Sequence, residues 1–198
     1  MARTIAKDHA EKRLAILGKA AEFFAANGYE RSSMNQLAEA CGVSKALIYH
    51  YYNSKEALLY DIVHTHLSDL LDTLLAVDQA ATSPDDTLRG LVQAILLAYR
   101  DADAEHKVQT AAMASLPDEQ RAVLADLQRQ MVAIVADILK AITPEVYAQN
   151  PEKLRPVAMT LFGMVNWFYM WHRPAKGLSR EDYADLVTDL VLGGVRGL

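Results

Sequence analysis

Proline is absent from the first 83 residues of this 198-residue chain, and this absence most constrains how the chain can fold. Long segments repeat apolar residues at the spacing of an α-helix, and none alternates strictly enough to predict a strand. The six prolines lie between these periodic segments, where helices end or begin. The sequence therefore predicts an all-α fold. Helices in the second half are predicted over residues 90–106, 117–142, 157–171 and 180–193.

A short helix, a glycine turn and a second short helix are predicted between residues 33 and 52. Ser32 or Ser33 can cap a short helix within residues 33–41, and Gly42 then supplies the turn residue. Ser44 can cap the next helix. Helix, turn and helix in this order is the arrangement in which the second helix enters a groove of DNA.

The segment from Ala40 to Lys55 contains no acidic residue, although the chain has a net charge of −5. The spacing of Ile48 and Tyr52 places both on the core side of the second helix, which leaves its other side chains nearer to solvent. Lysine, tyrosine and serine side chains can donate hydrogen bonds to phosphate oxygens, and an exposed leucine can contact a thymine methyl group. The side chains expected to contact double-stranded DNA are those of Ser33, Ser44, Lys45, Ala46, Leu47, Tyr49, His50, Tyr51 and Lys55.

Helix–turn–helix segments also occur in helical proteins that bind no DNA, and a specific resemblance favours the DNA-binding interpretation. The segment from Ala20 to Leu59 resembles the DNA-binding head of the TetR (tetracycline-repressor-type) family of transcriptional regulators. The matching residues are Phe23, Phe24, Gly28, Tyr29, Ser33, Leu37, Ala38, Gly42, Val43, Ser44, Lys45, Ile48, Tyr49, Tyr52, Ser54, Lys55 and Glu56. Tyr52 stands where that family usually has phenylalanine, and Asn53 where proline is common.

The resemblance implies a three-helix DNA-binding head at residues 1–54 and a helical body for ligand binding and dimerisation at residues 55–198. Two heads of a homodimer would then bind one operator, and a small-molecule effector would release it. The protein would act as a regulator, more specifically a repressor.

The segment from Val157 to Trp171 is almost entirely apolar. A helix that is apolar all round must be buried on more than one side, and the same helix of a second copy is the simplest partner. Together with the final predicted helix, it predicts a two-fold symmetric four-helix interface. The interface residues that we expect are Phe168, Trp171, Tyr183 and Leu190.

The segment from Gly163 to Val195 resembles the C-terminal part of TetR-family regulators that respond to acyl-CoA thioesters. The matching residues are Gly163, Asn166, Trp167, Trp171, Arg173, Pro174, Gly177, Leu178, Ser179 and Gly194. This resemblance implies an effector with an apolar acyl part and an anionic CoA part. The ligand contacts that we expect are Gln109, Met113, Arg129, Asn166 and Trp167. For Asn166 the alternative is a buried hydrogen bond to a neighbouring helix, and for Trp167 it is a place in the interface.

Several other classes of function lack their signatures. Cys41 is the only cysteine, so neither an intrachain disulfide nor a cysteine zinc site is expected. No apolar run predicts a membrane span and no secretory signal is recognised, which predicts a cytoplasmic protein without membrane contact. The sequence shows no cluster of metal ligands and no catalytic spacing, so we expect neither enzyme activity, metal nor cofactor. Control by a protein partner or by a hydrophobic drug, in place of an acyl-CoA, stays open.

Overall fold

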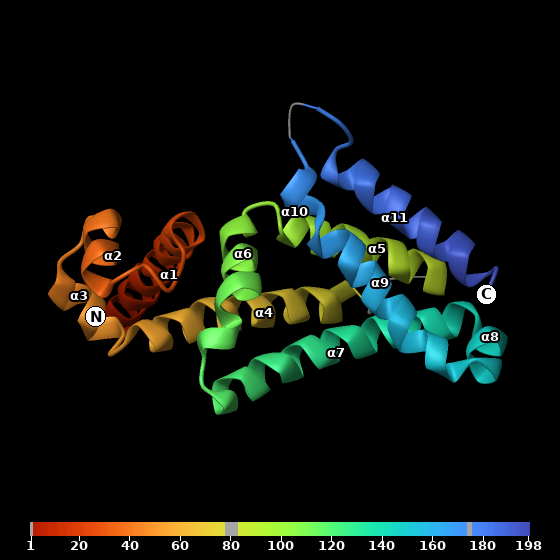
Figure 1. The fold of residues 1–198 in the computed structure, drawn as a ribbon, viewed down its shortest axis with the longest axis horizontal. Coiled ribbons are helices and arrows are strands. Elements are labelled where there is room, and N and C mark those ends of the chain that lie inside the picture. Colours follow the sequence, from red (N-terminus) through yellow and green to blue (C-terminus); the bar gives the residue numbers. More distant parts are fainter. Residues whose placement is uncertain (1, 78–82, 174–175) are drawn as a thin grey trace. The chain divides into compact units, whose positions relative to one another are not determined.

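The computed structural model describes residues 2–77, 83–173 and 176–198, with side chains for residue 9 and from residue 11 onward. Every regular element among these residues is a helix, which confirms the all-α prediction (Figure 1). The elements are α1 (Ala2–Asn27), α2 (Met34–Cys41), α3 (Lys45–Tyr51), α4 (Lys55–Val77), α5 (Pro84–Ala98), α6 (Asp103–Ala112), the 3-10 turn η1 (Met113–Ser115), α7 (Asp118–Ile142), α8 (Pro144–Gln149), the 3-10 turn η2 (Pro151–Lys153), α9 (Leu154–Asn166), α10 (Phe168–Trp171) and α11 (Arg180–Val195). Pro174, which contributes to the second resemblance, lies outside the described residues.

The chain forms two compact units. The first contains residues up to 67 together with 101–125, and the second contains residues 68–100 and 126–198. Helices α4 and α7 contribute residues to both units. The functional division between residues 54 and 55 stays a prediction.

The core of the first unit is built around α1, which packs against α2 and α6, while α2 packs against α3. Ala20, Ala21 and Phe24 are buried along one face of α1. The ring of Tyr29 stands edge-on to Phe24, with 5.3 Å between the ring centres. Cys41 is a buried free thiol at the end of α2. This packing holds α2 and α3 on one side of α1.

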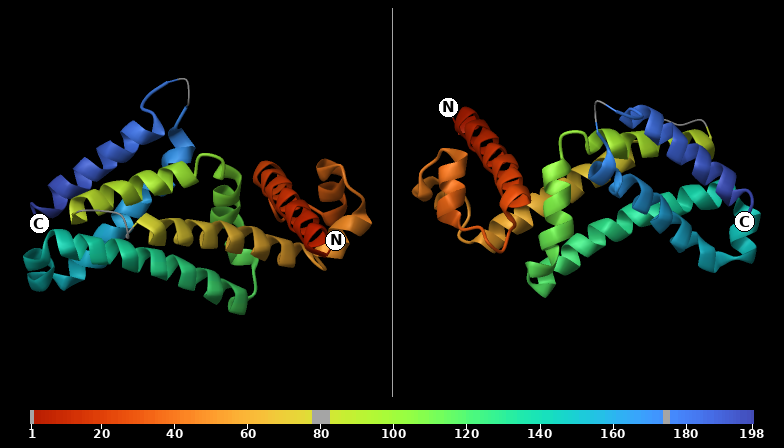
Figure 2. Two further views of the ribbon diagram at one scale, coloured as in Figure 1. Left: turned by 180° about the vertical axis from the view of Figure 1, so that it is seen from behind. Right: turned by 45° about the horizontal axis from the view of Figure 1, so that its top comes forward.

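The core of the second unit contains α11, which packs against both α5 and α9 (Figure 2). The contacts are apolar, because each of the three helices buries a stripe of aliphatic side chains. The most buried of these are Leu88, Leu91, Val92 and Ile95 on α5, Leu161 and Val165 on α9, and Ala184 and Val187 on α11.

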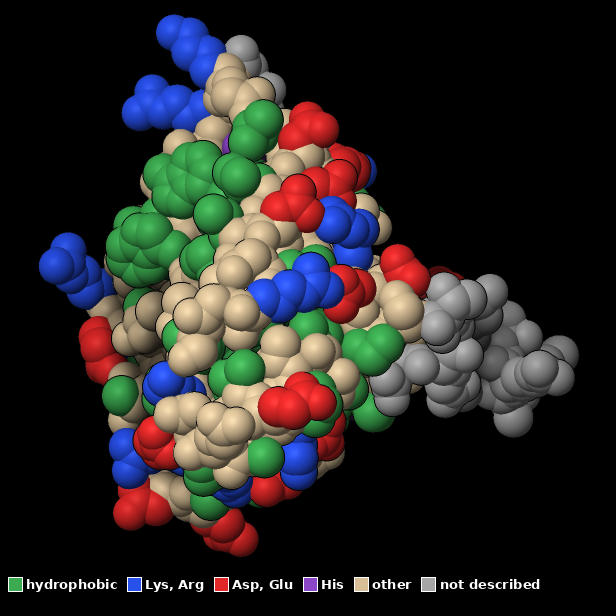
Figure 3. All heavy atoms as spheres, turned by 90° about the vertical axis from the view of Figure 1, so that its right-hand side faces the viewer, with side chains coloured by type: hydrophobic (Ala, Val, Ile, Leu, Met, Phe, Trp, Pro, Cys, Tyr) green, Lys and Arg blue, Asp and Glu red, His purple; other side chains and the backbone are tan. Residues whose placement is uncertain are grey.

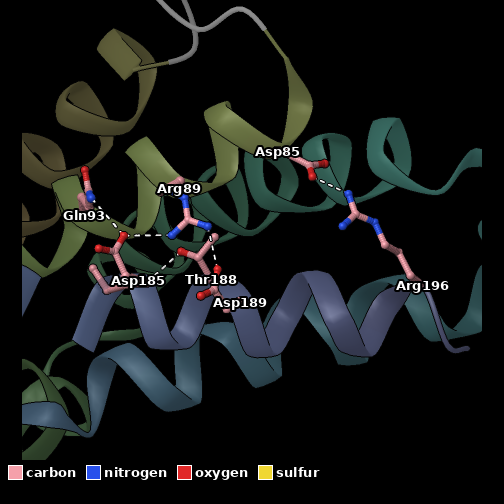
Figure 4. Close-up of polar contacts among 8 residues, drawn as sticks. Asp85, Arg89, Gln93, Asp185, Thr188, Asp189 and Arg196 are labelled. Carbon is pink, nitrogen blue, oxygen red and sulfur yellow. Dashed lines mark hydrogen bonds and ion pairs between the residues drawn. The ribbon is translucent and has the colours of Figure 1, made fainter. Parts of the chain in front are cut away.

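Ion pairs join α5 and α11 along their length (Figure 4). The Arg89 guanidinium donates to Asp185 at 2.8 Å and to Asp189 at 2.6 Å, and Arg196 pairs with Asp85. Asp185 and Asp189 lie one helical turn apart on α11, so Arg89 contacts two successive turns of that helix. These pairs fix the register of α11 on α5.

Two helices predicted as continuous are interrupted. The helix predicted over residues 90–106 is wrong, because α5 ends at Ala98 and α6 begins at Asp103. The helix predicted over 157–171 is also wrong, because α9 ends at Asn166 and α10 begins after Trp167. The two interruptions meet at one hydrogen bond, in which the Tyr99 hydroxyl donates to the Asn166 side chain at 2.9 Å.

Candidate nucleic-acid interface

The turn between α2 and α3 is fixed by local hydrogen bonds. The Ser33 hydroxyl accepts from the backbone of Gln36, whose side chain in turn accepts from the Ser33 backbone, which is a capping box. Gly42 ends α2 with a φ of 67°, a left-handed conformation that glycine adopts without strain. Its backbone and that of Val43 donate to the last carbonyls of α2. Local hydrogen bonds thereby place the start of α3, and Lys19 of α1 adds a hydrogen bond to the Cys41 carbonyl at 3.0 Å.

Helix α3 presents a polar surface to solvent. The Ser44 hydroxyl caps the helix by accepting from the Leu47 backbone at 3.1 Å. Ile48 is the only buried side chain among residues 45–51, and Tyr52 is buried just after them, as predicted. The exposed side chains are Lys45, Ala46, Tyr49 and His50, which we call the recognition surface.

The recognition surface can accept a polyanion without disrupting internal ion pairs. The Lys45 ammonium lies 5.6 Å from the centre of the Tyr49 ring and has no ion pair within the described ranges. No acidic side chain occurs between Ala40 and Lys55. A phosphate approaching this surface therefore meets a cation and phenol and imidazole groups, and it meets no carboxylate from this segment.

Tyr51, predicted to contact DNA, also contacts α1. Its ring centre lies 4.5 Å from that of His9, and its hydroxyl is 3.5 Å from the His9 carbonyl oxygen, a weak hydrogen bond. The side chain is half-buried, so part of the ring still faces solvent. The structure places Tyr51 between α1 and the recognition surface.

Lys55 makes contacts inside the first unit that were not predicted from the sequence. Its ammonium donates to the carbonyl oxygens of Tyr29 and Ser32, each at 3.0 Å, and lies 4.2 Å from the centre of the Tyr29 ring. These contacts hold the turn that connects α1 to α2. Lys55 therefore has a role within the fold of the first unit, and its contact with a DNA phosphate stays a prediction.

A carboxylate on α4 connects three parts of the first unit and was not identified from the sequence. The Tyr52 hydroxyl donates to Asp61 Oδ2 at 2.6 Å, and Arg13 Nε donates to the same oxygen at 3.0 Å. Arg13 Nη2 pairs with the other carboxylate oxygen. Burial, followed by the hydrogen bond to Asp61, raises the pKa of Tyr52, so the hydroxyl keeps its proton. The sequence signal was the tyrosine in place of phenylalanine at position 52.

The predicted ligand-contact residues are not brought together within either unit. Gln109 and Met113 belong to the first unit, whereas Arg129, Asn166 and Trp167 belong to the second. Arg129 lies on the surface, where it pairs with Asp126 at 2.9 Å. Asn166 accepts the hydrogen bond from Tyr99, which matches the alternative interpretation of a polar group satisfied between helices.

The second unit exposes large apolar side chains on α9, α10 and α11 (Figure 3). We call them together the apolar surface: Met159, Trp167, Met170, Trp171, Leu186 and Leu190. Trp167 and Leu190 are each 58% exposed. Isolated exposed apolar residues are ordinary, but several on adjoining helices indicate a contact surface.

Two of the predicted interface residues lie elsewhere. Phe168 is 1% exposed, so the prediction that its ring contacts a second copy is wrong. The ring stacks on Tyr183 and on His172, with centre distances of 4.7 and 4.2 Å. The Tyr183 hydroxyl donates to the carbonyl of Met164 at 3.1 Å, so most of this side chain is also used inside the subunit. Trp171 and Leu190 remain available to a partner.

Known families match two parts of the chain. Residues 16–62 match the family described as bacterial regulatory proteins, tetR family. Residues 81–195, more than half of the chain, match the family described as tetracyclin repressor-like, C-terminal domain. The chain belongs to the TetR family. This membership confirms the predicted resemblance, and with it a DNA-binding helix–turn–helix and a role in transcription regulation.

Several known proteins are similar to this chain along most of its length. The HTH-type transcriptional repressor KstR2 of Mycolicibacterium smegmatis is 25% identical over 198 residues, covering 94% of this chain and 91% of that protein. A TetR-family transcriptional regulator from Bordetella parapertussis is 33% identical, with a TM-score of 0.86 and coverage of 94% and 96%. AibR, solved in complex with isovaleryl coenzyme A and operator DNA, is 27% identical, with a TM-score of 0.78 and coverage of 90% and 96%.

Neither a membrane span nor a metal-binding group occurs in the part of this TetR-family chain that the structure describes. Across residues 2–77, 83–173 and 176–198, no helix has both the length and the apolar character needed to cross a bilayer. Within the same ranges, no three side chains of the metal-ligating types form a group that could hold an ion.

Proposed function

We propose that this protein is a homodimeric transcriptional repressor whose α3 helices read operator DNA and whose DNA affinity is lowered by an acyl-CoA effector. The observation that carries the proposal is the recognition surface, which is exposed and cationic in a chain of net charge −5. Repression is supported by the likeness to the transcriptional repressor KstR2, which resembles this chain along nearly its whole length.

In this proposal the DNA-contacting side chains, which lie on α3 and at the N-caps of α2 and α3, divide into two groups. Ser33, Ser44, Lys45, Tyr49 and Tyr51 bind phosphate oxygens, which position the head on the duplex without reading its sequence. Ala46, Leu47 and His50 approach the base edges in the major groove, where each base pair presents a distinct pattern.

The apolar surface provides the dimer contact. Trp171 and Leu190 lie on α10 and α11, and Met159 adds a flexible apolar side chain from α9. A two-fold symmetric interface brings together the same patch of both copies. An apolar patch can form such an interface because it is complementary to itself. The dimer places its two α3 helices in successive major grooves, roughly 34–36 Å apart.

The effector is proposed to be an acyl-CoA thioester. The support is the likeness to AibR, whose structure contains isovaleryl coenzyme A together with operator DNA. An effector releases DNA only if it binds the non-DNA-binding arrangement more tightly, and DNA then weakens effector binding by the same factor. This reciprocity gives the proposal a quantitative test.

The test is a binding titration on a fluorescent duplex from the region upstream of the chain's own gene. The wild type should bind this duplex more tightly than a scrambled duplex, and isovaleryl-CoA or longer acyl-CoAs should release it. The matching free acids and CoA alone serve as controls. Release by a hydrophobic drug with no response to any thioester would contradict the acyl-CoA part, and the absence of any preference for the upstream duplex would contradict the repressor part.

Lys45→Ala should weaken binding to both duplexes, because a phosphate contact is made on any sequence, and the matched control is Lys140→Ala, an exposed lysine near the end of α7 in the second unit. Equal weakening of binding in both variants would show that the effect reflects net charge, which both substitutions change equally.

A further inference from the structure

Helix α3 is held by few side chains of its own. It has seven residues, and Ile48 is the only one of them that is buried. Tyr52 follows directly, and its backbone N–H donates to the Ile48 carbonyl at 2.9 Å, which closes the helix. Apolar burial has no preferred direction, so these two anchors alone do not fix the rotation of α3, and the hydrogen bond from Tyr51 to the His9 carbonyl is weak.

The Tyr52 hydroxyl supplies a directional contact at this anchor. It donates to Asp61 at 2.6 Å, within the short range of hydrogen bonds to a carboxylate. Asp61 is itself fixed, because Arg13 from α1 binds both of its oxygens. The carboxylate thus ties the end of α3 to α1 and α4 through one charged group whose side chain is only 19% exposed.

We propose that Asp61 and the Tyr52 hydroxyl form a positioning pair that sets the orientation of α3 for reading the operator. The inference rests on the proposed function. The ring of Tyr52 is buried in the core and contributes to stability. The hydroxyl, which this chain adds, fixes the angle of the helix. Asp61 does not touch the DNA and acts only through Tyr52.

The two parts of Tyr52 can be separated by substitution. Tyr52→Phe removes the hydroxyl, keeps the ring and leaves the Arg13 pair to Asp61 intact. Base edges are read only by a correctly oriented helix, whereas phosphate contacts tolerate a small rotation. The substitution should therefore weaken binding to the operator and leave binding to unrelated duplex nearly unchanged.

The experiment compares operator and scrambled duplexes at 10 °C, with urea unfolding of the same samples. For Tyr52→Phe we expect about fivefold to tenfold weaker operator binding, the change that follows from removing one hydrogen bond. Scrambled duplex should bind within about twofold of the wild type, a change well below one hydrogen bond. The control is Tyr147→Phe on α8, whose buried hydroxyl has no partner within the described part of the chain and whose removal should change neither value.

A second pair of variants tests Asp61 itself. Asp61→Asn keeps an oxygen that can accept from Tyr52, so it should retain more of the operator preference than Asp61→Ala. Adding Tyr52→Phe to Asp61→Ala should weaken operator binding no further, because both changes remove the same hydrogen bond.

The outcomes are distinct. Unchanged operator binding by Tyr52→Phe with reduced resistance to urea would assign the pair to stability alone and overturn the inference. Equal weakening on both duplexes would overturn it as well, because orientation affects only the operator. A wild type without operator preference would overturn the proposed function, and this inference with it.

Discussion

The recognition surface on α3 and the apolar surface on α9, α10 and α11 are both exposed, yet they present opposite chemistry. The first offers an ammonium, a phenol and an imidazole, and its segment contains no acid. The second offers indole, thioether and leucine side chains. Water solvates the polar groups of the first surface well, whereas burying the second surface away from water lowers the free energy. This difference is the reason for proposing a polyanion as the partner of the first surface and a second copy of the chain as the partner of the other.

The largest expected effect is on stability, and it distinguishes a ring in the core from a ring on the apolar surface. Phe168→Ala should lower the free energy of unfolding by roughly 3–5 kcal/mol, because the ring is buried against Tyr183. Trp171→Ala should change the stability of the isolated subunit much less, because this ring is 50% exposed. Urea denaturation of both variants at low protein concentration makes the comparison. Similar decreases in the free energy of unfolding for the two variants would show that the two rings are equally buried in the subunit.

A charge on the apolar surface should dissociate the dimer without unfolding the subunit. Leu190→Glu would place an unpaired carboxylate in an apolar contact, which costs several kcal/mol, so the dimer should dissociate at least about 100-fold more readily. Sedimentation should then report the mass of one chain, 21.9 kDa, whereas twice that value is expected for the wild type.

The matched control for Leu190→Glu is Ala133→Glu on α7, an exposed position in the same unit that lies outside the apolar surface. If both variants remain dimeric, the contact between copies lies elsewhere. If the wild type is monomeric, no dimer forms through the apolar surface.

Acid should weaken the first unit through a buried histidine. His66 on α4 packs against His106 on α6, with ring centres 5.9 Å apart, and burial followed by the charge of His106 lowers the pKa of His66 to about 4. In the unfolded chain the pKa of this histidine is 6.5. Between pH 6.5 and pH 4 the unfolded state therefore binds more protons than the folded state, and the free energy of unfolding decreases as the pH is lowered. From pH 7 to pH 5 the decrease should be about 2 kcal/mol.

Urea unfolding monitored at several pH values tests this dependence, and His66→Phe should reduce it. A slope in the variant equal to that of the wild type would assign the acid sensitivity to other groups.

The smallest expected effect concerns the ion pairs of α5 and α11. Arg89→Ala should cost up to about 1 kcal/mol, since the pairs to Asp185 and Asp189 are partly exposed and screened by salt. Thermal unfolding in low and high salt measures the difference, which should shrink as salt is added. A decrease of several kcal/mol that persists in high salt would show that the ion pairs, and not the apolar stripe, hold α11.

The head could be predicted from sequence more fully than the body, for a physical reason. Ser33, Gly42 and Ser44 act through hydrogen bonds within a few residues, so local signals specify α2, α3 and their turn. The placement of Lys55 could not be predicted in this way, because the destination of a long side chain depends on carbonyls more than twenty residues earlier. The same reason applies to Asp61, since Arg13 approaches it from 48 residues away.

In the body, the errors follow from tertiary contacts that spacing cannot report. No proline or glycine marks the end of α5, where Tyr99 turns inward and binds Asn166. Phe168 is buried because its ring stacks on Tyr183 and His172, whereas Trp167 and Trp171 are exposed. A sequence pattern predicts faces only as far as the helix stays unbroken.

The most direct test of the central claim is the salt dependence of operator binding by the wild type, Lys45→Ala and Tyr49→Ala. If the recognition surface binds the phosphates, both variants bind more weakly, and the slope of log affinity against log salt flattens by about 0.9 for each phosphate that a variant no longer neutralises. The fold should be intact in both, because neither side chain is buried. Affinities and slopes equal to those of the wild type in both variants would contradict the assignment of α3 to the DNA groove.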